Sequence, residues 1–310
     1  MREILVIRLG AMGDVIHVLP AVAALRESFP QTRLTWIVEP RWMPLIDSVL
    51  VHQVIPLNRR KWASVRQAWA SMRVRAFDLA IDFQGLIKSA LVAKASGAAR
   101  VAGYANPRET PARWFYDVLV KPESAHIVDH HLELAQAIGA AGKAKSFPLP
   151  AGTAEGTLPA GRFVLACPFA GWASKEWPLD RYAELGRLLA AHNVRLVLNG
   201  HPAVEAQLRR LEHVNVHISS IAGLIDATRR ASAVLGLDSG PLHLAAALQK
   251  PGVALFGPTD PARNGPYGST IRVLRSADAV TSYKRLPEVD PSMLALTPAE
   301  VGKALLEVLS

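Results

Sequence analysis

The sequence predicts an α/β protein of two domains, each built on a parallel sheet. Short apolar runs alternate with helical stretches along the chain. The alternation stops over residues 142–161, which are rich in Gly and Pro, and then starts again. A length of 310 residues also suits domains of roughly 150 residues each. We therefore predict domains at 1–150 and 151–296, followed by a C-terminal helix at 297–310.

The first half contains five strand-like runs separated by helical stretches. The runs are nearly continuous in apolar residues, which is typical of parallel strands buried on both faces. The strands are predicted at 4–7, 34–38, 54–57, 79–82 and 100–103, and the helices at 15–28, 65–75 and 85–95.

The second half repeats this pattern. Strands are predicted at 163–167, 195–198, 214–218, 233–236, 253–256 and 271–274, and helices at 180–192, 203–211, 221–231, 241–248 and 298–309. The last helix has Thr297 as its expected N-cap and Glu300 three residues later, which is the pattern of a capping box. Ligands bind such sheets beyond the carboxyl ends of the strands, so we expect the active site in a cleft between the two domains.

Composition excludes several classes of protein. Half of the residues are hydrophobic, which excludes a disordered chain. Cys167 is the only cysteine, which excludes an intramolecular disulfide and a cysteine-based zinc site. No apolar run reaches the roughly 18 residues that a membrane span needs. The charge of +9 (35 Lys and Arg, 26 Asp and Glu) favours an acidic partner, either nucleic acid, a phosphorylated metabolite or an anionic membrane surface.

The first strand leads into a turn that could carry chemistry, RLGAMGD at 8–14. Gly10 and Gly13 allow a ligand to approach the backbone closely. Asp14 opens the following helix at the predicted cleft edge. Asp14 equally fits a carboxylate that stabilises a helix N-terminus. The turn lacks the G-x-G-x-x-G fingerprint of dinucleotide binding.

A second polar turn, DSGPLH at 238–243, follows the predicted strand at 233–236. The backbone amides of Ser239 and Gly240 would point out of a helix N-terminus, which suits a diphosphate. His243 lies within the first turn of the same helix. The alternative is a capped core helix in which His243 bonds to the backbone.

Two further loops fall on the same predicted sheet edge. The loop FGPTDP at 256–261 offers Thr259 and Asp260, although such residues are also common in ordinary turns. The loop at 168–178 contains Gly171 and Lys175. Lys175 could meet a phosphate as a point charge, or it could be a solvent-exposed lysine.

A basic run with interleaved tryptophans lies in the first half. It consists of Arg59, Arg60, Lys61, Arg66, Arg73 and Arg75, with Trp62 and Trp69 among them. It could be a solvated helix face, or a surface for an acidic or membrane-embedded partner.

The absence of several sequence motifs limits the classes of reaction that the chain could catalyse. The chain has no P-loop, no G-x-S-x-G elbow and no Asp-x-Asp pair that would hold a metal against a diphosphate. His130 and His131 are adjacent and so make a poor zinc pair. A metal-free reaction on a diphosphate compound is the expectation.

In their order, the motifs resemble those of glycosyltransferase family 9, the bacterial lipopolysaccharide heptosyltransferases. The matching segments are RLGAMGD at 8–14, IDFQGLIKS at 81–89, KEWP at 175–178, DSGPLH at 238–243 and FGPTDP at 256–261. Within the family, the heptosyltransferase I members are the most similar. The resemblance implies a GT-B architecture of two Rossmann-like doubly wound domains facing a central cleft. The N-terminal domain would bind the acceptor, the C-terminal domain the nucleotide-sugar, and the terminal helix would cross back to the N-terminal domain.

The resemblance also implies an activity and its residues. Heptose would pass from ADP-heptose to the Kdo sugar of Kdo2-lipid A, with inversion and without a metal or other cofactor. Asp14 would be the catalytic base. The donor would contact Gly171, Lys175, Asp238, Ser239, Gly240, His243 and Thr259, and the acceptor would contact Gly13, Arg59, Arg60 and Lys61.

The resemblance further implies a monomeric cytoplasmic enzyme that associates peripherally with the inner membrane and binds no nucleic acid. Two alternatives stay open. One is a heptosyltransferase II or III type of enzyme that uses a heptosylated core as acceptor. The other is a non-enzymatic protein that binds nucleotides or nucleic acid.

Overall fold

The computed structural model describes residues 1–141 and 146–310. The chain divides into two units, Met1–Pro150 and Ala151–Ser310, at the predicted boundary. Residues 142–145, the first part of the predicted linker, lie outside the described residues. In the described part of the chain, no helix is both long enough and apolar enough to cross a membrane.

The first unit is a six-stranded parallel sheet in the order β3-β2-β1-β4-β5-β6. Its strands are β1 (Glu3–Ile7), β2 (Arg33–Val38), β3 (Gln53–Pro56), β4 (Leu79–Asp82), β5 (Arg100–Tyr104) and β6 (Val118–Val120). Its helices are α1 (Met12–Ser28), α2 (Trp62–Arg73), α3 (Ile87–Ala95) and α4 (Ile127–Ala137), with 3-10 segments η1 (Pro40–Leu45) and η2 (Thr110–Phe115).

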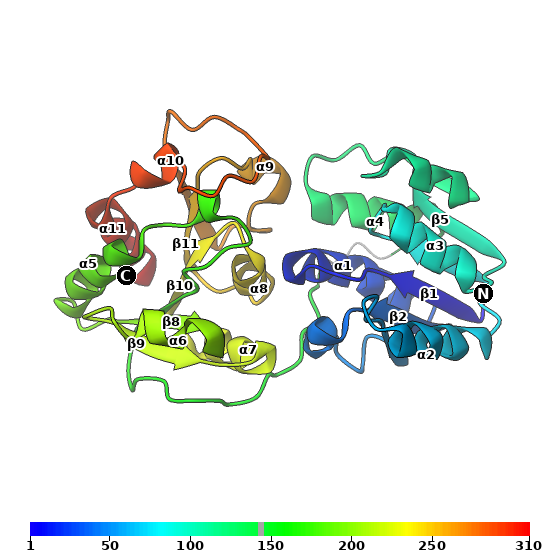
Figure 1. Cartoon of the computed structure of the whole chain (residues 1–310), viewed down its shortest axis with the longest axis horizontal. Helices are drawn as coiled ribbons and strands as arrows, with labels where there is room; N and C mark the ends of the chain where they lie inside the picture. Colours follow the sequence, from blue (N-terminus) through cyan, green and yellow to red (C-terminus); the bar gives the residue numbers. More distant parts are fainter. Residues whose placement is uncertain (142–145) are drawn as a thin grey trace. The chain divides into compact units, whose positions relative to one another are not determined.

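Helices cover both faces of this sheet. The helices α1 and α4 pack side by side on one face (Figure 1). On the other face, α2, α3 and η2 share one core with the strands, to which they contribute Ala68, Ala90 and Ala112. The order of the strands reverses between β1 and β4, so loops that follow these two strands diverge and leave a crevice for a ligand.

The second unit repeats the architecture, in the order β12-β11-β10-β7-β8-β9. Its strands are β7 (Phe163–Ala166), β8 (Arg195–Gly200), β9 (Asn215–Ile218), β10 (Ala233–Leu237), β11 (Gly252–Phe256) and β12 (Ile271–Arg275). Its helical segments are η3 (Ala173–Lys175), α5 (Leu179–Ala190), η4 (Pro202–Val204), α6 (Glu205–Leu208), α7 (Ile221–Arg230), α8 (Gly240–Ala247), α9 (Pro261–Asn264), α10 (Pro291–Leu294) and α11 (Pro298–Leu309). Here the switch point lies between β7 and β10.

The terminal helix α11 has the predicted capping box. Thr297 Oγ1 accepts the amide of Glu300, and the Glu300 carboxylate accepts the amide of Thr297. That the helix crosses back to the first unit stays a prediction, whereas it packs against α5, β10 and β11 of the second unit. The physical reason is its apolar face: Val301 and Leu305 are buried in the same core as Leu185 of α5.

Candidate active site

Asp14 lies in the first turn of α1, just beyond the carboxyl end of β1. Its Oδ2 accepts the amide of Ala11 at 3.0 Å, as the helix-stabilising interpretation predicts. Its Oδ1 also lies 2.7 Å from Nη2 of Arg8. The Asp14 side chain is 37% exposed, whereas that of Arg8 is 8% exposed. The carboxylate is therefore fixed by two donors and still reaches solvent.

Arg8 is not among the predicted site residues. Its guanidinium also donates from Nη1 to the carbonyl of Phe83, which follows β4. The backbone amide of Leu9 donates to the Gln84 side chain at 2.9 Å. These bonds tie the loop after β1 to the loop after β4, at the switch point of the first sheet. The signal in the sequence is a charged residue that directly follows a fully apolar strand.

A buried carboxylate beneath these loops keeps them in place. Asp82 ends β4 and accepts the hydroxyls of Ser89 and Tyr116, each at 2.7 Å, as well as the amide of Gln84 at 2.8 Å. Burial raises the pKa of the Asp82 carboxyl, although each of these hydrogen bonds lowers it. Burial and the neighbouring Asp82 also raise the pKa of Tyr116, so its hydroxyl stays protonated and can donate.

The proposed acceptor residues lie around the start of α2. Arg59 Nη2 is 3.3 Å from the Glu39 carboxylate, whereas Arg60 and Lys61 are exposed just before the helix. Gly13 is buried in the first turn of α1.

In the second unit, Lys175 and Asp238 form an ion pair across the other switch point. Lys175 ends η3 in the loop after β7, and Asp238 directly follows β10. Nζ of Lys175 lies 2.7 Å from Oδ2 of Asp238 and 3.1 Å from its backbone carbonyl. Both side chains are mostly buried, at 13% and 9% exposure, so the interpretation of Lys175 as a solvent-exposed lysine is wrong.

Two neighbours complete this cluster. The ammonium of Lys175 lies 4.2 Å from the centre of the Trp172 ring, and the Arg285 guanidinium lies 5.3 Å from it. Oδ1 of Asp238 is 3.8 Å from Nε2 of His243. Two segments distant in sequence thus supply cations, Lys175 and Arg285, around the Trp172 ring, and a third supplies the Asp238 carboxylate.

The predicted helix after the DSGPLH turn is confirmed as α8, with Ser239 at its N-cap and Pro241 in its first turn. The Ser239 side chain makes no capping hydrogen bond, and its Oγ is buried without a partner among the described residues. Thr259, which follows β11, is also buried, and its Oγ1 has no partner in the same described ranges. Gly171 lies exposed with open space around it.

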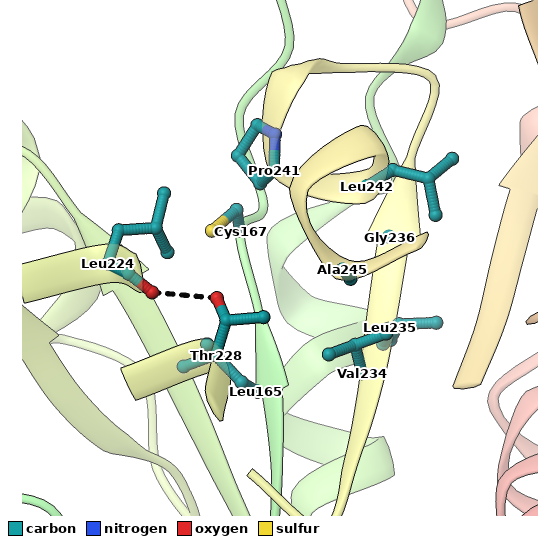
Figure 2. A pocket seen from close by; sticks show the side chains of 10 residues that line it. All are labelled: Leu165, Cys167, Leu224, Thr228, Val234, Leu235, Gly236, Pro241, Leu242 and Ala245. Carbon is teal, nitrogen blue, oxygen red and sulfur yellow. Dashed lines mark hydrogen bonds between the residues drawn. The ribbon is translucent and has the colours of Figure 1, made fainter. Parts of the chain in front are cut away.

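A small apolar cavity lies between α7, α8 and the sheet (Figure 2), and Lys175 and Asp238 are not among the residues that line it. Its volume of about 10 Å³ is near the lower limit for a single water molecule. Cys167 lines it, and burial raises the pKa of that thiol to about 12. The cavity therefore cannot hold a nucleotide-sugar, and Cys167 is not a thiolate nucleophile near neutral pH.

Comparison with known proteins decides the family. The sequence pattern of glycosyltransferase family 9 (heptosyltransferase) matches residues 65–289. The chain belongs to glycosyltransferase family 9. It is 30% identical to lipopolysaccharide heptosyltransferase 1 of Escherichia coli K12, over 88% of this chain and 93% of that protein. It is 26% identical to the lipopolysaccharide core heptosyltransferase OpsX of Haemophilus influenzae, over 88% and 84% of the two chains.

A solved family 9 structure confirms the fold. The E. coli heptosyltransferase WaaC with ADP-2-deoxy-2-fluoro heptose superposes with a TM-score of 0.80 and 25% identity. The alignment covers 97% of this chain and 98% of that one. The predicted GT-B type of α/β fold and the predicted glycosyltransferase class are therefore confirmed. The family motifs at 8–14, 175–178 and 238–243 are the segments that carry both ion pairs described above.

Proposed function

We propose that this family 9 enzyme transfers L-glycero-D-manno-heptose from ADP-heptose to the Kdo sugar of Kdo2-lipid A, with inversion and without a metal. The WaaC structure that it resembles holds an ADP-heptose analogue, and a relative with 30% identity is named lipopolysaccharide heptosyltransferase 1. The observation that carries the proposal is the Lys175–Asp238 pair beside the N-terminus of α8.

Lys175 has the chemistry to hold the donor diphosphate. An ammonium has three N–H donors, and Asp238 takes up two of them through Oδ2 and the backbone carbonyl. The third is left for a phosphate oxygen. The backbone amides of Ser239 and Gly240 at the start of α8 and the helix dipole favour the same negative charge, which grows as ADP leaves. We assign Ser239, Gly240, His243, Thr259 and Gly171 to the surroundings of the donor.

Asp238 has a second role in this proposal. Its Oδ1 is not engaged by Lys175 and can accept a hydroxyl of the heptose, while its Oδ2 keeps Lys175 in place. A buried carboxylate that is already paired with a cation contacts a neutral sugar without adding an unpaired charge.

Asp14 serves as the general base. The C–O bond of the new glycoside forms as the bond from the anomeric carbon to the diphosphate breaks, and the attacking hydroxyl loses its proton to the Asp14 carboxylate. Arg8 is the residue that orients Asp14, because it holds Oδ1 while the Ala11 amide holds Oδ2. Arg59, Arg60, Lys61 and Gly13 are assigned to the acceptor, whose sugar and phosphate groups are anionic.

We also propose that the enzyme acts as a monomer on the cytoplasmic side of the inner membrane, with which it associates peripherally. The lipid-linked acceptor requires such a location, and the basic first unit suits an anionic surface.

A transfer assay tests this function. The protein is incubated, with and without EDTA, with ADP-heptose and either Kdo2-lipid A or the same acceptor that already carries one heptose. The products are examined by mass spectrometry and NMR. We expect one heptose on Kdo2-lipid A with inverted anomeric configuration. Product from the heptosylated acceptor alone would contradict the acceptor, and loss of product in EDTA would contradict metal independence. A failure of transfer with both acceptors would contradict the function.

A further inference from the structure

The outer face of α2 carries a stripe in which aromatic and basic side chains alternate. Trp62, Arg66, Trp69 and Arg73 follow the spacing i, i+4, i+7 and i+11, which places them along one side of a helix. All four are exposed, and the two tryptophans are 77% and 53% exposed. A different side of α2, with Ala68 and Met72, is buried in the core of the sheet.

The rest of this helical layer continues the stripe. Trp114 on η2 is 79% exposed, and α3 exposes Ile87 and Leu91. The segments α2, α3 and η2 cover the same face of the first sheet (Figure 1). Of the seven tryptophans in the chain, the three that are exposed all lie on this layer. Exposed large apolar side chains gathered on one face mark an interaction surface rather than ordinary solvation.

The same stretch of chain is strongly basic. Residues 57–121 contain 12 Lys and Arg against 4 Asp and Glu, so 12 − 4 gives +8 of the total of +9. The four carboxylates are engaged elsewhere: Asp82 is buried, Asp78 and Glu109 accept backbone amides, and Asp117 lies by Lys94. In the described ranges, none of them pairs with Arg66 or Arg73.

We propose that this face, the α2 stripe with Trp114, Ile87 and Leu91, docks on the surface of a bilayer that contains anionic phospholipid. Tryptophan prefers the boundary between head groups and acyl chains, and arginine pairs with head-group phosphates. Exposed Ile87 and Leu91 would gain nothing from a purely ionic partner such as nucleic acid. The inference rests on the proposed function only in that a lipid-linked acceptor gives the docking its purpose.

Vesicle binding tests the proposal without the acceptor. The full chain is mixed with vesicles of phosphatidylethanolamine and phosphatidylglycerol, or of phosphatidylcholine alone, and bound protein is separated by flotation. We expect binding to the anionic vesicles, weakened by salt, and weak binding to phosphatidylcholine. The double variant Arg66→Ser/Trp69→Ser should bind at least about fivefold more weakly, which is the effect of one lost positive charge near such a surface.

A matched control removes a charge and an exposed apolar side chain elsewhere. Leu294→Ser/Lys303→Ser does this on the second unit and should bind as the wild type does. Trp114→Ser is an independent variant of the proposed face and should also weaken binding. Wild-type binding by both variants of the face, or no binding of the wild type to anionic vesicles, would overturn the proposal. So would duplex DNA that displaces the protein from the vesicles and binds both variants of the face more weakly than the wild type, because the face would then be a nucleic-acid site.

The two proposals fail in different ways. Transfer to a water-soluble, deacylated acceptor should be unchanged in Arg66→Ser/Trp69→Ser, whereas transfer to acceptor embedded in vesicles should fall about as much as binding does. Equal loss with both acceptors would overturn the docking role. Absence of any transfer by the wild type would refute the proposed function but would leave the result of the vesicle experiment intact.

Discussion

Lys175 and Asp238 are 63 positions apart in sequence, yet Nζ of the lysine lies 2.7 Å from Oδ2 of the aspartate. The first unit has a counterpart at its own switch point, where Arg8 reaches Asp14 at 2.7 Å and the carbonyl of Phe83 beyond β4. In each unit, a cation from the loop after the first strand joins the two central loops and fixes a carboxylate. In the proposed reaction, the Lys175–Asp238 pair binds the donor and the Arg8–Asp14 pair supplies the base.

Replacing Lys175 should affect both donor binding and stability. Lys175→Gln removes a charged hydrogen bond to the diphosphate, which corresponds to about 1.5–3 kcal/mol and to a rise of roughly 10- to 100-fold in the Kd for ADP-heptose. It also leaves Asp238 buried without its cation. In a double-mutant cycle, Lys175→Gln/Asp238→Asn should therefore be more stable than Lys175→Gln alone. Calorimetry and urea unfolding measure the two effects, and additive unfolding free energies would contradict the pairing.

Replacing Arg8 should lower the rate of turnover but should leave the binding of the donor unchanged. Arg8→Gln frees Asp14 from one of its two fixed partners, and we expect kcat to fall by about 10- to 100-fold because orientation is lost. Arg8→Lys should restore part of the rate, because a single ammonium can pair with Asp14 but lacks the fork that also reaches Phe83. The KM for ADP-heptose is the internal control. A large change in that KM, or a complete rescue by lysine, would argue against a positioning role.

His131 should make stability depend on pH. Burial, followed by the nearby Arg8, holds the pKa of His131 well below 6.5. The unfolded chain therefore takes up a proton below about pH 6.5 that the folded protein does not, and stability falls as the pH falls. Against a His131→Gln variant, the wild type should lose at most about 1.4 kcal/mol of relative unfolding free energy per pH unit between pH 6.5 and 5. Urea unfolding at several pH values measures this difference, and a flat difference would show that the histidine is not buried as a neutral ring.

Local patterns predicted most of the architecture. Of the twelve strands in the described part of the chain, eleven lie at predicted places, because buried parallel strands are apolar runs of recognisable length. The strand β6 (Val118–Val120) is only three residues long and gives no such run. The helix α4 (Ile127–Ala137), which carries the adjacent His130 and His131, is not among the predicted helices. Yet Val128, Leu132 and Ala135 form an apolar stripe that indicates a helix.

The pairings within the site could not be predicted in the same way. Local rules placed Asp14, Lys175 and Asp238 at the ends of strands, but nothing local says which cation meets which carboxylate. Arg8 donates to the carbonyl of Phe83, which lies 75 positions further along the chain. The two residues meet because β1 and β4 are neighbours in the sheet. The packing of α11 on α5 has the same origin, because nothing local to the helix says which neighbouring element its apolar face covers.

The central proposal is that Asp14 acts as the base and that the second unit binds the donor. It is tested most directly by Asp14→Asn, for which donor binding and turnover are measured in one preparation. Asparagine can still accept the amide of Ala11, so the start of α1 should keep its structure. The account predicts an unchanged Kd for ADP-heptose and a kcat lower by at least about 100-fold, as expected when a general base is lost. Asp117→Asn, which changes an exposed carboxylate of the same unit, should behave as the wild type does. Wild-type turnover by Asp14→Asn, or loss of donor binding in that variant, would contradict the account.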